Sequence, residues 1–179
     1  MAPFFMDRQN IYLVGLMAVG KTTVGRVLAE SLGMQFYDTD AEVELRAGAD
    51  IGWIFDVEGE QGFRDREQCV VDELTKRHDV VLATGGGVIL RECNRKALAT
   101  RGIVVHLDSS IRRLVERTRN DRKRPLLQQG NAKATLTRLK AERGPLYEEI
   151  ADYRFVTDQQ SPKVLARAIE DRLREDQLI

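Results

Sequence analysis

The sequence is poor in the residues that characterise several large classes of protein. Its two cysteines, Cys69 and Cys93, are not spaced like metal ligands, so we expect reduced thiols. No apolar run approaches the roughly 20 residues that cross a bilayer. The opening segment "MAPFFM" is too short for the core of an export signal. These features predict a cytoplasmic protein.

Excess charge of either sign is also lacking. Lysine plus arginine and aspartate plus glutamate each number 28, which gives a formal net charge of zero. A balanced charge argues against a protein that binds nucleic acid or a membrane surface. The 179 residues are enough for one domain with a substantial core. We expect a single domain over residues 1–179, a monomer whose partner is a small molecule.

Short apolar segments alternate with longer segments of helical periodicity. Unalternating apolar runs are typical of strands buried on both faces, and strand–helix alternation indicates a parallel sheet with helices on both sides. The predicted class is α/β, in three layers around a five-stranded parallel sheet. The expected strands are Ile11–Val14, Gln35–Tyr37, Val80–Ala83, Ile103–Leu107 and Tyr153–Val156. The expected helices are Lys21–Leu32, Ala41–Ala47, Gln61–Arg77, Arg91–Ala99, Ile111–Arg119, Ala132–Ile150 and Pro162–Glu175.

The segment "GLMAVGKTT" follows the first expected strand and matches the P-loop pattern. Glycines let the backbone wrap closely around phosphate oxygens, and the following helix adds its positive end. Lys21 is predicted to reach the β- and γ-phosphates, and Thr22 to bind Mg²⁺. The predicted contacts to ATP here are Gly15, Ala18, Val19, Gly20, Lys21, Thr22 and Thr23.

Two carboxylates, Asp38 and Asp40, follow the second expected strand, at the sheet edge where α/β proteins bind ligands. One could serve a magnesium ion, and the other could accept the proton of an acceptor hydroxyl. In the alternative interpretation, Asp40 merely caps the helix expected from Ala41.

Two further patterns each allow a functional and an ordinary interpretation. Arg64 and Glu67 share a helix face, where they form either part of a site or a surface ion pair. Glycines 85–87 follow an apolar strand, either as a tight turn or as backbone exposed to a small ligand.

Basic residues are concentrated between Arg112 and Arg124, where seven stand against two acidic residues. A nucleic-acid patch would need interleaved aromatic residues for base stacking. The irregular segment 120–131 is better explained as a mobile lid that closes over phosphates and supplies an arginine. Arg143 lies further along and could simply be solvated.

Taken together and in order, these segments resemble the shikimate kinase family from about Asn10 to Leu173. The resemblance rests on "GLMAVGKTT", "DTD" at 38–40, "FR" with Glu67, "GGG" at 85–87, "RPLL" from Arg124 and "RGPLY" from Arg143. It implies a P-loop kinase fold, and transfer of the ATP γ-phosphate to the 3-hydroxyl of shikimate with Mg²⁺ present.

Residue roles are implied by the same resemblance. Asp40 contacts the acceptor hydroxyl and takes its proton, while Asp38 and Thr22 serve magnesium. Arg64 and Arg143 hold the shikimate carboxylate, Glu67 orients Arg64, and Gly86 contacts the ligand through its backbone; residues 40–70 form the substrate-binding region. Lys21 and the lid residue Arg124 act at the phosphates, Arg117 lies near adenine, and Gln160 belongs to the adenine loop "VTDQQSP".

Two other functions compete with this interpretation. A kinase resembling gluconate kinase would share the P-loop and lid but need not carry both Arg64 and Arg143. A nucleotide-hydrolysing switch would normally have an acidic residue closing the strand Val80–Ala83, where Thr84 and glycines stand instead. His78 and His106 are interpreted as structural.

Overall fold

The computed structural model describes residues 9–119 and 130–179, and it confirms the predicted α/β class. The described residues form one parallel sheet in the strand order β2-β3-β1-β4-β5. Its strands are β1 (Asn10–Val14), β2 (Gln35–Asp38), β3 (Val80–Ala83), β4 (Gly102–Asp108) and β5 (Tyr153–Val156). All five match the expected segments to within one residue at either end.

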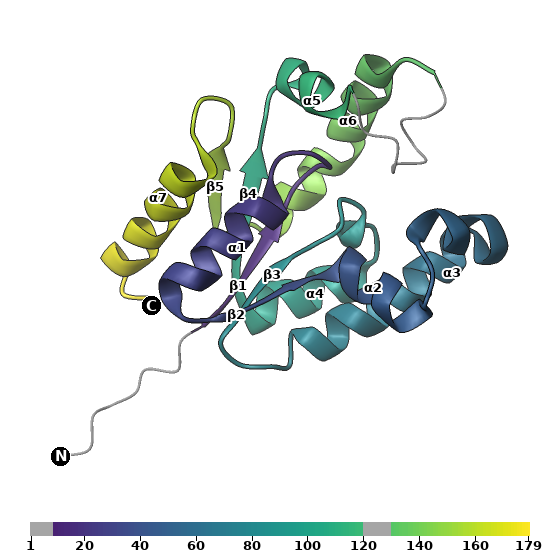
Figure 1. Ribbon diagram of the computed structural model, residues 1–179. Coiled ribbons are helices and arrows are strands. Elements are labelled where there is room, and N and C mark those ends of the chain that lie inside the picture. Colours follow the sequence, from purple (N-terminus) through teal and green to yellow (C-terminus); the bar gives the residue numbers. More distant parts are fainter. Residues whose placement is uncertain (1–8, 120–129) are drawn as a thin grey trace.

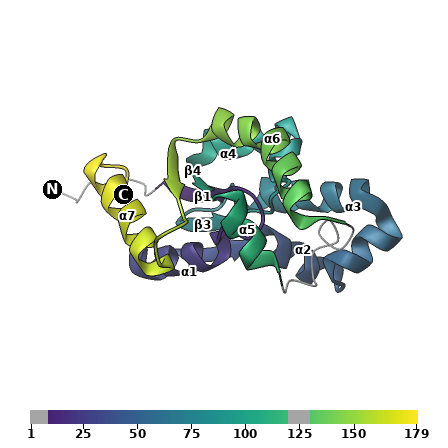
Figure 2. The same cartoon turned by 90° about the horizontal axis from the view of Figure 1, so that it is seen from above.

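Helices cover both faces of this sheet (Figure 1). They are α1 (Lys21–Leu32), α2 (Thr39–Ala47), α3 (Ile51–Leu74), α4 (Glu92–Arg101), α5 (Ile111–Thr118), α6 (Ala132–Ile150) and α7 (Pro162–Glu175), with a short 3₁₀ helix, η1 (Val88–Leu90). Figure 2 shows α1 and α7 on one side of the sheet and α4 and α6 on the other. This is the predicted three-layer arrangement.

The hydrophobic core lies along the central strands. Every residue of β1 and of β3 is buried, as expected for strands covered on both faces. The edge strands β2 and β5 are only partly buried, so the expectation of complete burial is wrong for the two edges. No helix in the described ranges is both long and apolar enough to cross a membrane.

The start of α3 differs most from the prediction. The helix begins at Ile51, ten residues before the expected Gln61, and the Asp50 side chain caps it by accepting from the Trp53 amide. Gly59 interrupts it with φ 72° and ψ 178°, a conformation that essentially only glycine adopts. The break at Gly59 and a second glycine, Gly52, dilute the helical pattern of this stretch, which is why the sequence indicated only the second half.

Candidate active site

The loop between β1 and α1 has the geometry of a phosphate-binding loop. Gly15 has φ 147°, and a Cβ there would lie 2.3 Å from the Leu107 carbonyl oxygen of β4. Ala18 and Gly20 also have positive φ, at 64° and 101°. Among residues 9–119 and 130–179 no side chain caps α1, so the first amides of this helix are left for an anion.

Lys21 is the first residue of α1, and its side chain turns back across this loop. Its ammonium donates to the carbonyls of Gly15 and Leu16, both at 2.7 Å, and the residue is buried. These bonds hold the charge at the mouth of the loop. The lysine predicted to contact phosphates therefore lies at the loop. Thr22 and Thr23, which follow it and are also predicted to contact ATP, are exposed.

The two predicted magnesium ligands meet in space. The Thr22 hydroxyl donates to Asp38 Oδ2 at 2.6 Å, which joins the start of α1 to the end of β2. A hydroxyl and one carboxylate fit Mg²⁺, because this ion usually keeps several waters and takes its remaining ligands from phosphates. No group of three or more His, Cys, Asp or Glu within the described ranges forms a metal cage.

Asp38, not Asp40, caps helix α2. Asp38 Oδ1 accepts from the amides of Asp40 and Ala41 at 3.0 and 3.2 Å, so α2 begins at Thr39, two residues earlier than expected. The alternative in which Asp40 serves as the cap is therefore wrong. Asp40 is left to face the site.

Asp40 lies in an environment unfavourable to its charge. Its Oδ1 is buried and accepts no hydrogen bond from any residue in the described ranges. Burial, and then the charges of Asp38 and Glu67, raise the pKa of Asp40 from 3.8 to about 7. A carboxylate with such a pKa is well matched to accepting a proton near neutral pH.

The pair Arg64–Glu67 is buried rather than on the surface. Arg64 Nη1 donates to Glu67 Oε2 at 2.7 Å, and the residues are 8% and 0% exposed. Burial raises the pKa of Glu67, and the Arg64 guanidinium offsets part of that rise. Arg64 Nε has no hydrogen-bond partner within the described ranges. A buried guanidinium with an unused donor suits an incoming anion.

The triglycine segment 85–87 is surrounded by these side chains. A Cβ on Gly85 would lie 2.5 Å from Asp40 Oδ1, and one on Gly87 only 2.2 Å from Arg64 Nη2. A Cβ on Gly86 would lie 3.3 Å from the Met17 amide nitrogen and 3.5 Å from Arg143 Nη1. Each glycine thus makes room for a different part of the site, which a simple turn would not require.

Arg143 reaches the site from α6 and is 6% exposed, so the alternative of a solvated arginine is wrong. Gly86 is the meeting point, since the P-loop backbone lies on one side of it and Arg143 on another. Two arginines from distant helices therefore lie at one glycine segment.

Arg117 joins the P-loop to the loop that follows β5. Its Nη1 donates to the carbonyls of Ala18 and Val19 at 3.1 and 3.2 Å, and its Nη2 to the Thr157 carbonyl at 3.2 Å. Gln160 is exposed in that same loop. The predicted lid arginine, Arg124, lies outside the described residues, as does most of the predicted lid.

Sequence reasoning missed two polar groups behind the triglycine. Thr39 is fully buried and accepts from the Gly85 amide at 2.8 Å, and Tyr147 donates its hydroxyl proton to the Gly86 carbonyl. The position of Tyr147, four residues after Arg143 on one helix, is the signal that could have indicated it.

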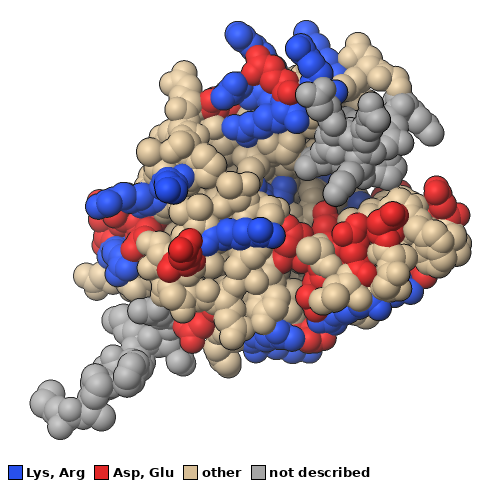
Figure 3. All heavy atoms as spheres, in the orientation of Figure 1, with Lys and Arg blue, Asp and Glu red and all other residues tan. Residues whose placement is uncertain are grey.

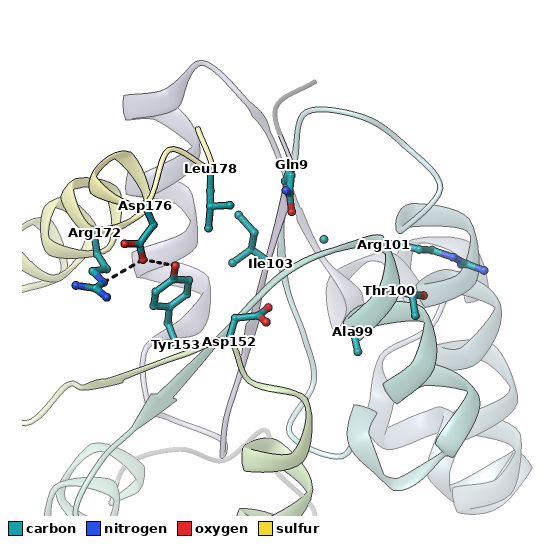
Figure 4. Close-up of a pocket in the computed structure, with 11 residues that line it drawn as sticks. Gln9, Ala99, Thr100, Arg101, Ile103, Asp152, Tyr153, Arg172, Asp176 and Leu178 are labelled. Atoms are coloured by element: carbon teal, nitrogen blue, oxygen red, sulfur yellow. Dashed lines mark hydrogen bonds and ion pairs between the residues drawn. The ribbon is translucent and has the colours of Figure 1, made fainter. Parts of the chain in front are cut away.

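The surface around the site carries both signs of charge. Figure 3 shows basic side chains over α5 and acidic side chains over α2 and α3, on either side of the hollowed centre of this face. A separate hollow of about 780 Å³ lies at the opposite, amino-terminal ends of β4 and β5 (Figure 4). Its Asp176 pairs with Arg172 and accepts from the Tyr153 hydroxyl.

The fold and the site define a small P-loop kinase. The model of the shikimate kinase family matches residues 17–174. A shikimate kinase from Vibrio vulnificus is 53% identical over 169 residues, which is 94% of this chain and 98% of that protein. A solved shikimate kinase from Acinetobacter baumannii, in complex with shikimate, is 49% identical with a TM-score of 0.93 and covers 96% of each chain.

The chain therefore belongs to the shikimate kinase family, as the sequence resemblance indicated. A gluconokinase from Sinorhizobium meliloti is similar in fold alone, at 20% identity and a TM-score of 0.55, over 95% of each chain. Neither competing function, a gluconate kinase or a hydrolytic switch, accounts for the family match.

Proposed function

We propose that this chain transfers the γ-phosphoryl group of ATP to the 3-hydroxyl of shikimate, giving ADP and shikimate 3-phosphate. The observation that carries the proposal is the convergence at Gly86 of the P-loop backbone and Arg143, with Arg64 at the next glycine. This arrangement supports a binding site for a small carboxylate beside a binding site for phosphates, which is what direct transfer between two bound substrates requires.

On the nucleotide side, the P-loop amides and Lys21 hold the β- and γ-phosphates. Thr22 and Asp38 would hold Mg²⁺, which neutralises charge on the phosphate oxygens when bound. Arg117 lies between the P-loop and the loop after β5, where it and Gln160 border the adenine. The roles of Arg124 and of a lid over residues 120–131 rest on the basic sequence of this segment and on the family resemblance.

On the acceptor side, Arg64 and Arg143 bind the shikimate carboxylate, with Glu67 holding Arg64 in place. The Gly86 backbone contacts the ring. Asp40 accepts the hydroxyl proton as the oxygen attacks phosphorus and the bond from the γ-phosphorus to the bridging oxygen of ADP breaks. The buried Oδ1 of Asp40, which has no hydrogen-bond partner among the described residues, supports this role.

We further propose that the chain acts as a single-domain monomer in the cytoplasm, without nucleic-acid or membrane partners. The zero net charge and the mixed charge on the face in Figure 3 support this, because neither provides an extended basic surface. The two cysteines are free and exposed, as suits a reducing compartment.

The test is an assay of ADP release with ATP and Mg²⁺, comparing shikimate with gluconate and with no acceptor. We expect release only with shikimate, and one phosphate on the 3-oxygen of the product by phosphorus NMR. Equal release without an acceptor would indicate a hydrolytic switch, and release with gluconate would indicate a different acceptor site.

A further inference from the structure

Tyr147 is a buried tyrosine that the proposed chemistry does not use. It lies on α6, is 1% exposed, and donates its hydroxyl proton to the Gly86 carbonyl. Its ring centroid lies 5.1 Å from that of His106 on β4, so the ring is fixed between helix and sheet. Burial raises the pKa of Tyr147 well above its ordinary value of 10, so the hydroxyl keeps its proton and remains a donor.

This hydrogen bond fixes the direction of a whole peptide unit. The Gly86 carbonyl and the Gly87 amide belong to one planar group, and no peptide bond in the described ranges is cis. Because the carbonyl points to Tyr147, the Gly87 amide hydrogen points away from it. Both residues are glycines, so the backbone φ and ψ changes of a peptide flip are open to this peptide.

A flip would matter because of what surrounds the segment. Arg143 Nη1 lies 3.5 Å from the Cβ position of Gly86, and Arg64 Nη2 lies 2.2 Å from that of Gly87. Burial raises the pKa of Tyr147, and the positive charge of the nearby Arg143 offsets part of that rise. In the flipped state the carbonyl oxygen would replace the amide hydrogen on the side away from Tyr147, and a partial negative charge would oppose the bound carboxylate.

We propose that Tyr147 is a positioning residue that holds the Gly86–Gly87 peptide in the direction needed to bind the acceptor carboxylate. The inference rests on the proposed function, because it assigns Tyr147 to the shikimate side of the site. Helix α6 then serves shikimate twice, through Arg143 directly and through Tyr147 by way of the glycine backbone.

The test compares Tyr147→Phe with Tyr12→Phe. Tyr12 is a matched control, since it is 0% exposed and its hydroxyl also interacts with backbone carbonyls, those of Thr75 and Arg101, away from the site. We expect Tyr147→Phe to raise the KM for shikimate about tenfold, or about 1.4 kcal/mol. The KM for ATP should change less than about twofold, and Tyr12→Phe should leave both constants unchanged.

A second readout needs no turnover. In ¹⁵N-labelled protein, the Gly87 amide resonance should broaden or double in Tyr147→Phe and remain single in Tyr12→Phe. A parent enzyme that fails to phosphorylate shikimate would refute the proposed function, and with it the assignment of Tyr147.

If the parent enzyme is active, two results would overturn the positioning role of Tyr147 and leave the proposed function intact. One is an unchanged shikimate KM together with an unchanged Gly87 resonance. The other is an equal rise in the KM for ATP and for shikimate, because that would indicate general loosening around the P-loop.

Discussion

Asp38 and Asp40 are two residues apart, yet their surroundings give them different chemistry. Asp38 accepts from the Thr22 hydroxyl and from two amides of α2, so its charge is stabilised on both oxygens. Asp40 has a buried oxygen without a partner in the described ranges and a pKa raised to about 7 by burial and neighbouring acids. A metal ligand benefits from the first environment and a proton acceptor from the second.

The first prediction concerns proton transfer by Asp40. Asp40→Asn keeps the size of the side chain but removes its basicity, so we expect kcat to fall about 100-fold or more. The KM for ATP should change little, because the P-loop and Lys21 are unaltered. Steady-state kinetics with both substrates provide the measurement. If only the KM for shikimate changed, Asp40 would be a binding residue and not a base.

The second prediction concerns recognition of the carboxylate. Arg64→Ala should lower kcat/KM for shikimate at least tenfold, about 1.4 kcal/mol, and hardly affect its methyl ester. Arg64→Lys should also lower kcat/KM for shikimate, because an ammonium cannot make the planar two-pronged contact. The measurement is kcat/KM for both acceptors in parent and variants.

Arg66→Ala is the matched control for this cycle, since Arg66 lies on the same helix in a more exposed pair with Glu58. It should leave both acceptors unchanged. Equal losses for acid and ester in Arg64→Ala would mean that Arg64 shapes the pocket without reading the carboxylate.

Among the elements, the triglycine segment 85–87 between β3 and η1 is closely surrounded by side chains and backbone of other elements. Carboxylates from α2 and α3 approach Gly85, α6 and the P-loop approach Gly86, and the Arg64 guanidinium of α3 occupies the space beside Gly87. The segment therefore joins four elements, namely the P-loop, α2, α3 and α6. A side chain added at Gly85 must displace Asp40 or Glu67, and one added at Gly87 must displace the Arg64 guanidinium.

The third prediction tests this packing at Gly87. In Gly87→Ala the new methyl would lie 2.2 Å from Arg64 Nη2, so the guanidinium must move. We expect the KM for shikimate to rise at least about tenfold, since a hydrogen bond to a charged group contributes about 1.5–3 kcal/mol. The KM for ATP should remain close to that of the parent.

Gly144→Ala is the control, because a Cβ there meets no described atom within 4 Å other than its chain neighbours and the backbone of its own helix. It should leave both KM values unchanged. Parent-like shikimate binding in Gly87→Ala would show that Arg64 does not depend on this glycine.

At the scale of the whole molecule, the site lies at the carboxyl ends of the strands, where α1, α2, α3 and α6 approach one another (Figures 1 and 2). Buried charges gather there, whereas most other ion pairs in the described ranges are on the surface, as Arg46–Glu73 and Lys76–Asp72 are. Burying charge for function costs folding stability. The cost should therefore appear in the stability of the free enzyme as a function of pH.

The fourth prediction states that dependence. The pKa of Asp40 is about 7 in the folded state against 3.8 ordinarily, so the folded state binds its proton more tightly. Its contribution to stability is then complete below about pH 4 and is lost as pH rises through 7. Asp40→Asn has no charge to bury, so we expect it to exceed the parent in stability by about 1–3 kcal/mol at pH 8, and by much less at pH 4.

Urea unfolding between pH 4 and 8, with EDTA and without nucleotide, measures this difference. Asp72→Asn is a control of opposite sign, because hydrogen bonds from Lys76 and Arg101 lower the pKa of Asp72. Its stability relative to the parent should not improve as pH rises. A constant difference between Asp40→Asn and the parent across this range would contradict the burial of charge at Asp40.

The strands, most helix ends and the P-loop could be predicted from the sequence, because each depends on residues that are close together along the chain. Strands such as Val80–Ala83 are continuous apolar runs, and α1 and α7 end near the predicted residues because their periodicity and caps are local. The P-loop is equally local, since its glycines and lysine must follow one another along the chain. The family resemblance added an acceptor and residue roles that no single short segment specified.

For the polar residues, the packing of distant segments selects between two plausible interpretations. Whether Asp38 or Asp40 caps α2, and whether Arg64 and Arg143 are solvated or buried, depends on neighbours brought together from distant segments. The first half of α3 and the contact of Tyr147 with Gly86 likewise could not be predicted from nearby residues in the sequence. Burial and the pKa shifts that follow from it arise from packing between elements, and a sequence pattern records only the residues within each element.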